Sequence, residues 1–274
     1  MANHPENKKK GKSARLRING GRMLMKKMLA LLMAIAMLCF ASAYAEDPAA
    51  IKAGDLVCMG IQDDGIGFDC IWRVLDADQT STGEPGMFLL CESLIGGATY
   101  FREETSPTTN AYAGSDAQQW CAAFFEAHFT EAEKEAILPT YKSDDAYARV
   151  SGLAFMGNPT VHFDAAPEIL RGDKVFLLSA EEADQPAYGF ADDNSRIAYY
   201  QNEPANWWLR SPHDPSFPID VGVVYFSGWL LDFYENMNSI MSTGPVCMRP
   251  AFNLDTTCIR NAEKTDDGVW HLGF

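Results

Sequence analysis

The stretch Phe68-Asp-Cys-Ile-Trp-Arg-Val-Leu75 alternates along its length, so that Cys70, Trp72 and Val74 fall on one face of an extended chain. Aromatic and β-branched residues with this period of two are typical of a strand. We therefore predict a strand here and build the rest of the fold outward from it.

The neighbouring segments extend this strand into a sheet. Residues 54–60 are also strand-like, and the Gly- and Asp-rich residues 62–67 between the two segments have the chemistry of a tight turn. A polar loop at residues 77–86 precedes Met87-Phe-Leu-Leu-Cys91, an apolar run that indicates a buried strand. These segments predict a three-stranded antiparallel meander.

Helices are predicted in the middle of the chain. One begins at Ser115-Asp116 and carries apolar residues at helical spacing, and a second begins at Thr130, which forms a capping box with Glu133. Another S/T-x-x-E pattern at Ser179 opens a helical turn. Residues 142–172 are rich in Gly, Pro and Asp, and we predict irregular structure there.

The last third of the chain returns to strand-like sequence. The predicted strands lie at residues 174–178, 207–210, 220–226, 229–233, 246–249 and 251–254. Strands, then helices, then strands favour an α+β fold with an antiparallel sheet core and two or three short helices. Neither a flexible linker nor a repeat interrupts the sequence, so we predict a single globular domain over residues 46–274.

The N-terminal residues have the pattern of an export signal. Basic residues Lys26 and Lys27 precede an apolar run, and Ala43 and Ala45 form an A-x-A cleavage site, so residues 23–45 are predicted to be a Sec signal peptide. Residues 1–22 are interpreted as a start-site artefact or an extended basic n-region. An uncleaved anchor is the alternative; cleavage is favoured, and it predicts a secreted protein with no membrane insertion afterwards.

Net charge excludes some partners. The chain has 22 Lys and Arg and 37 Asp and Glu residues; nine of the basic residues and one acidic residue lie before residue 46, which leaves 13 against 36 and a net charge of −23 for the rest. Such an acidic body repels phosphate backbones and anionic lipid. We therefore expect no nucleic-acid partner.

Six cysteines follow the signal, an even number that permits disulfides in an exported protein. Cys58 and Cys70 flank a predicted hairpin turn, and Cys247 and Cys258 flank a predicted strand, so these two pairs are the disulfide candidates. The alternative is that they are small buried apolar residues, which is the interpretation favoured for Cys91 and Cys121.

Three blocks of sequence resemble a bacterial family described as domain of unknown function 6273. They are Ser115–Phe125 with Phe129–Ile137, then Asp173–Glu182, and finally the pair Trp207-Trp-Leu-Arg-Ser-Pro212 and Arg249-Pro-Ala-Phe-Asn-Leu254. The departures are Cys121-Ala122 in place of Leu-Asn and Cys247-Met248 in place of a Gly-Val lead-in. The family has no assigned activity, so the resemblance implies a fold more than a function.

That implied fold is C-type-lectin-like, because a Trp-containing strand and a final Arg-containing strand are similar to those domains and to the formylglycine-generating enzymes. The redox cysteine pair of the latter cannot be matched here, so their activity is not carried over.

Aromatic and arginine residues are the candidate ligand-binding groups. Exposed aromatic rings stack on sugars and other apolar ligands, and the candidates are Tyr200, Trp207, Trp208, Tyr225 and Trp229 within a cluster that also includes Tyr199 and Tyr234. The alternative is that Trp207 and Trp208 belong to the core, with Trp229 the better candidate for exposure. Arg210 and Arg249 lie in apolar strands, where a buried guanidinium needs a carboxylate or carbonyl partner. An ion pair, with Asp220, Asp232 or Asp255 as candidate partners, is favoured over recognition of an anionic ligand.

Metal and enzyme signals are sparse. Glu203 and Asn206 faintly resemble the calcium motif of lectins, but a turn is favoured there; no cofactor is predicted, with Ca²⁺ as the alternative. The catalytic motifs of hydrolases, zinc proteases and nucleotide-binding proteins are absent from the sequence.

The leading hypothesis is a secreted, non-enzymatic recognition domain for an unknown extracellular ligand, either glycan or protein. The alternatives are an enzyme of the formylglycine-generating type or a hydrolase, and a structural envelope protein.

Overall fold

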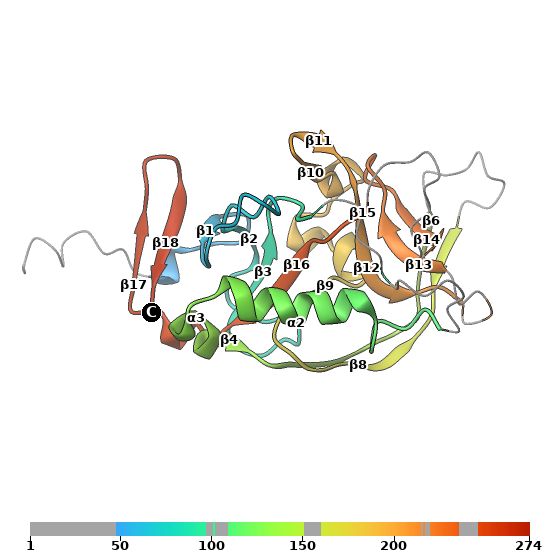
Figure 1. Ribbon diagram of the computed structural model, residues 1–274, viewed down its shortest axis with the longest axis horizontal. Helices are drawn as coiled ribbons and strands as arrows, with labels where there is room; N and C mark the ends of the chain where they lie inside the picture. The colour runs from blue at the N-terminus through green and yellow to red at the C-terminus, as the bar shows by residue number, and fades with distance from the viewer. Residues whose placement is uncertain are drawn as a thin grey trace, which may run out of the picture. The chain divides into compact units, whose positions relative to one another are not determined.

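The computed structural model describes residues 48–96, 101, 109–150, 160–214, 216, 220–235 and 246–274 (Figure 1). The predicted leader, residues 1–22 and 23–45 with Ala43 and Ala45, lies outside the described residues. Residues 46–274 group into one compact unit. Within the described ranges, no helix has the length and apolar character needed to cross a membrane.

The largest sheet has eight strands and contains the predicted meander. Strands β1, β2 and β3 are antiparallel neighbours, and β3 continues to β16 and β4, with β9 also on β16. Its strands are β1 (Leu56–Cys58), β2 (Ile71–Asp76), β3 (Met87–Cys91), β4 (Ile137–Leu138), β9 (Phe176–Leu177), β16 (Pro250–Leu254), β17 (Asn261–Lys264) and β18 (Val269–Gly273).

The other sheets are smaller. A four-stranded sheet has the order β14-β13-β12-β15, and three pairs, β5–β8, β6–β7 and β10–β11, make two-stranded sheets. Their strands are β5 (Thr140–Asp144), β6 (Tyr147–Val150), β7 (Thr160–Phe163), β8 (Ala166–Asp173), β10 (Tyr199–Tyr200), β11 (Glu203–Pro204), β12 (Asn206–Pro212), β13 (Asp220–Val224), β14 (Leu230–Glu235) and β15 (Val246–Cys247).

The two α-helices of the described chain begin where the sequence predicts. The Ser115 side chain caps α2 (Asp116–His128), and Thr130 and Glu133 make a reciprocal capping box at the start of α3 (Glu131–Ala136). Figure 1 shows α2 in green in front of the strands, and it contacts β9. The 3-10 helices are η1 (Pro48–Ala50), η3 (Glu182–Asp184), η4 (Pro186–Tyr188), η5 (Asn194–Arg196) and η6 (Thr256–Cys258).

Three predictions about the strands need correction. The described residues 142–150 and 160–172 are not irregular, because β6, β7 and most of β5 and β8 lie there. Their polar, partly exposed sequences hide the strand pattern. Strands β17 and β18 were not predicted from the sequence. The sheets are not purely antiparallel, since β1 pairs with β18 and β12 with β15 in parallel. The fold is β-rich, with fewer helices than strands.

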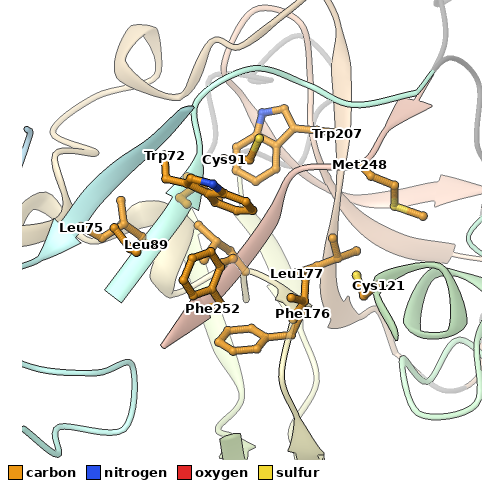
Figure 2. Close-up of a cluster of buried hydrophobic side chains, with 14 of the residues drawn as sticks. Trp72, Leu75, Leu89, Cys91, Cys121, Phe176, Leu177, Trp207, Met248 and Phe252 are labelled. Carbon is orange, nitrogen blue, oxygen red and sulfur yellow. The ribbon is translucent and has the colours of Figure 1, made fainter. Parts of the chain in front are cut away.

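The core lies between the large sheet, helix α2 and strand β12. Trp72 is fully buried and meets Phe252 edge to face, with ring centroids 4.6 Å apart. Trp207 of β12 belongs to the same buried cluster (Figure 2). The large sheet and the sheet that contains β12 therefore share one core.

Candidate functional site

A cavity of about 490 Å³ opens between the large sheet and the segment from η4 to β10. The sheet contributes Arg73 of β2, Glu92 after β3 and Arg249 before β16. The opposite wall includes aromatic side chains, namely Tyr188, Phe190 and Tyr199. A pocket with mixed apolar and charged walls is the usual form of a small-molecule site.

Arg249 is the most unusual residue of this cavity. It is 4% exposed, its Nε donates to the Cys91 carbonyl oxygen at 3.0 Å, and its Nη2 makes a longer contact of 3.4 Å with the Glu92 carbonyl oxygen. The guanidinium carbon lies 5.0 Å from the centre of the Trp207 ring. Carbonyl oxygens and an aromatic face therefore hold the guanidinium. The favoured ion pair with Asp220, Asp232 or Asp255 is wrong for Arg249, whereas a carbonyl partner was the other kind of partner predicted.

One nitrogen of this guanidinium has no partner. Nη1 of Arg249 is shielded from solvent and makes no hydrogen bond to any described residue. Burial lowers the pKa of Arg249 to about 10, although the nearby Glu92 opposes the shift. The group is still charged at neutral pH, and a buried donor left unpaired costs about 1–3 kcal/mol. Such an orphan donor in a residue that lines a cavity makes Arg249 a candidate contact for a ligand.

A second arginine lies in the same cavity. Arg73 Nε donates to Glu92 Oε2 at 2.7 Å, and Arg73 Nη2 contacts the other carboxylate oxygen. The two side chains are 37% and 29% exposed, so this ion pair is only partly shielded from water. Among the described residues, the charged members of the lining are Arg73, Arg249 and Glu92, and their charges sum to +1.

Arg210, in contrast, is fully satisfied within the protein. Its guanidinium donates to both carboxylate oxygens of Asp144 at 2.7 and 2.8 Å and to those of Glu182 at 2.6 and 3.0 Å. The predicted partners Asp220, Asp232 and Asp255 were therefore wrong, although an ion pair was the favoured interpretation. Arg210 holds β5, β12 and η3 together and is not available to a ligand.

This ion-pair network makes stability depend on pH. Burial alone would raise the pKa of Glu182, but Arg210 and Lys142 outweigh it and lower the pKa from 4.5 to about 2. A lowered carboxyl pKa contributes stability above pH 4.5 that is lost as the pH falls towards 2. In acid unfolding followed by circular dichroism, the Glu182→Gln variant should be less stable than wild type at pH 7. Its free energy of unfolding should also decrease less steeply than that of wild type as the pH falls below 4.5. The exposed neighbour supplies the control, since Glu181→Gln should keep the wild-type profile; identical profiles for both variants would contradict the prediction.

The predicted aromatic candidates are divided by the structure. Trp207 and Trp208 are both fully buried, so neither ring is exposed for direct stacking on a ligand, and the core interpretation holds for both. Tyr200, Tyr225 and Trp229 are partly buried against the core. Tyr199 is 52% exposed and lines the cavity. The side chain of Tyr234 lies outside the described residues.

The faint calcium pattern does not form a ligand cluster. Asn206 is buried, and its side-chain oxygen accepts a hydrogen bond from the Phe226 backbone at 2.8 Å, whereas Glu203 is exposed on β11. Across the described ranges, no group of three or more His, Cys, Asp or Glu side chains could hold a metal ion.

All six cysteines of the body are free thiols in the structure. Cys58 of β1 lies opposite Ile71, one residue from Cys70, and burial together with the Cys58 thiol raises the pKa of Cys70 to about 12. Cys247 lies in β15 and Cys258 in η6. The structure shows neither the Cys58–Cys70 nor the Cys247–Cys258 disulfide formed, and both pairings stay predictions. The pKa of every one of these thiols is raised, first by burial, which disfavours the thiolate form needed for nucleophilic chemistry.

Sequence reasoning missed most of the cavity. Arg73 and Glu92 were not predicted as site residues. Arg73 is a charged residue inside an apolar strand, and Glu92 directly follows the next strand, so this pattern could have indicated a pair of charged side chains at one place on the sheet. Tyr188 and Phe190 lie in a segment for which no regular element was predicted. Of the candidate residues from the sequence, Arg249 and, from the wider aromatic cluster, Tyr199 are in the described lining of this cavity.

These features define a β-rich protein with a cavity lined by arginine and aromatic side chains. The family model described as domain of unknown function (DUF6273) matches residues 86–256, more than half of the chain, and the chain belongs to this family. The matched range includes Glu92, Tyr199 and Arg249, whereas Arg73 precedes it. No curated protein and no solved structure matches the chain.

Proposed function

We propose that this chain is a secreted, non-enzymatic recognition domain whose ligand enters the cavity beside Arg249. The observation that carries the proposal is the buried guanidinium with an unpartnered Nη1 in the lining of a cavity of about 490 Å³. Buried polar groups are nearly always hydrogen-bonded, and an exception is a reason to expect a missing partner.

The alternatives receive less support. An enzyme that uses cysteine requires a thiolate, and burial raises the pKa of both Cys58 and Cys70. A purely structural envelope protein needs no concave site, yet a cavity with a charged wall is present. The likeness to C-type-lectin-like domains stays part of the proposal; it is supported by the strand β12, which carries Trp207 and Arg210, and by Arg249 next to β16.

Tyr199 offers a direct test, because its exposed ring can be removed without opening the core. The chain should be expressed with its own leader and purified from the culture medium, where N-terminal sequencing is expected to begin at Glu46. It should then be applied to a glycan array and to cell-surface extracts. The Tyr199→Ala variant lacks one aromatic contact, so it is expected to bind the ligand about fivefold to tenfold more weakly than wild type.

The matched control is Tyr141→Ala. Tyr141 is 70% exposed and does not line this cavity, so this variant should bind as wild type does. Absence of any ligand for the wild-type chain on the array and in the extracts would refute a recognition function. Equal binding by all three proteins would place the ligand elsewhere on the surface and refute the proposed site.

A further inference from the structure

We infer that the cavity beside Arg249 recognises a small monoanionic carboxylate attached to an apolar or ring-shaped body. This inference rests on the proposed function and specifies the class of ligand, which that function leaves open. It follows from the charge of the lining, from the geometry of the two arginines and from the aromatic wall.

The charge of the cavity is opposite to that of the protein around it. Residues 46–274 carry a net charge of −23, whereas the charged residues of the described lining, Arg73, Arg249 and Glu92, sum to +1. Extended polyanions are repelled by the acidic surface, but a small anion inside the cavity meets mainly the local charge, because exposed charges beyond about 8 Å are screened at physiological salt. A net charge of +1 matches a carboxylate better than a doubly charged phosphate.

The two arginines offer donors of different kinds. The Cys91 and Glu92 carbonyl oxygens and the Trp207 ring fix the Arg249 guanidinium, and its Nη1 is the nitrogen for which no described residue accepts a hydrogen bond. Arg73 is held by the Glu92 carboxylate in the same lining. Since the Arg73–Glu92 pair is partly exposed, its rearrangement is inexpensive. Nη1 of Arg249 is shielded from solvent while this pair is intact, so the inferred binding step has two parts. A ligand carboxylate replaces the Glu92 carboxylate on Arg73, and the local rearrangement that moves Glu92 then lets the same carboxylate accept from Nη1 of Arg249.

The opposite wall suits the rest of such a ligand. Phe190 is buried, Tyr188 is partly buried and Tyr199 is exposed, and all three residues line the cavity. Aromatic faces favour flat or ring-shaped apolar surfaces. A free inorganic anion would leave this wall without a contact, which is why the carboxylate is inferred to belong to a larger organic molecule.

Matched pairs of acids and amides test the inference by isothermal titration calorimetry on the secreted chain. One arm compares D-galacturonate with D-galacturonamide, and the other compares N-acetyl-phenylalanine with its amide, so the two arms separate a sugar acid from an amino-acid carboxylate. In at least one arm the acid should bind at least about tenfold more tightly than its amide, as expected for a charge-assisted hydrogen bond. Inorganic phosphate should bind more weakly than that acid.

Two substitutions at the ion pair sharpen the result. Glu92→Gln raises the charge of the lining from +1 to +2 and releases Arg73, so it should strengthen binding of the acid several-fold and leave the amide unchanged. Arg73→Gln should weaken binding of the acid. The matched control is Glu168→Gln, which removes the same charge from an exposed ion pair with Arg171 outside the cavity and should change neither ligand.

The outcomes separate the inference from the proposed function. If acids and amides bind equally, or if neither acid binds, the carboxylate class is wrong, while a ligand found on the array or in the extracts would keep the recognition function. If Glu92→Gln weakens binding of the acid, the proposed exchange of carboxylates is wrong. Because Glu92 and Arg73 are partly exposed, both variants are expected to fold, and their thermal unfolding verifies this before titration.

Discussion

Replacement of Arg210 with methionine is expected to lower the free energy of unfolding by about 3–5 kcal/mol, the usual cost of breaking a buried ion pair from one side. The substitution leaves the carboxylates of Asp144 and Glu182 buried without the guanidinium that both accept from. It also removes the donor to the Leu177 carbonyl oxygen of β9, 2.7 Å away. Urea unfolding followed by tryptophan fluorescence measures the loss.

Two further variants separate the charge from the packing. Arg171→Met removes an exposed arginine and should change stability little. Adding Asp144→Asn and Glu182→Gln to Arg210→Met neutralises the stranded carboxylates and should restore part of the stability. A loss below about 1 kcal/mol for Arg210→Met alone would show that the network contributes no more than an exposed pair.

Gly228→Ala is expected to destabilise the protein by about 3 kcal/mol or more, because overpacking and backbone strain act together. Gly228 has a φ of +84°, and an added Cβ would lie 1.6 Å from the backbone oxygen of Asp193. The Gly228 carbonyl oxygen also accepts a hydrogen bond from Nε of the fully buried Arg196 at 2.8 Å. The added carbon therefore forces η5 away from the turn before β14. Thermal unfolding provides the measurement.

The control for this prediction is Gly83→Ala. Gly83 has a similar φ of +80°, but nothing lies within 4 Å of its added Cβ. It should therefore show only the strain of the left-handed conformation, about 1–2 kcal/mol. Equal losses for the two variants would mean that η5 moves aside freely and that the close approach at Gly228 is unimportant.

The strands and helix starts that could be predicted are those determined by residues close together in the sequence. The meander around Trp72 follows from alternation, and the helix starts at Ser115 and Thr130 follow from side chains that bond to backbone groups three residues away. Strand β5 could not be predicted in this way. Its Asp144 is buried because Arg210, 66 positions away, neutralises it. Burial of a charge that depends on a distant partner leaves no trace in the sequence around it.

The candidate site was harder to predict for a related reason. The sequence indicates that Arg249 needs a partner, but its contacts are the backbone carbonyl oxygens of Cys91, at the end of β3, and of Glu92, together with the ring of Trp207. Backbone carbonyl oxygens occur at every position, so no residue type marks these two as partners in advance. Arg73 and Tyr199 reach the same cavity from segments that are far apart in the chain. Their meeting depends on the sheet order and on the path of the segment between η4 and β10, and neither can be derived from spacing alone.

The parallel pairing of β1 with β18 has a consequence for biosynthesis. Leu56, near the start of the described body, takes its neighbour from Val269, more than 200 positions later. While the ribosome is still adding the intervening residues, β1 has one unpaired edge, and the sheet lacks β17 and β18 on that side. A nascent chain is therefore held in an incomplete state for most of its synthesis, and any chain that terminates before residue 269 retains an open strand edge that invites aggregation.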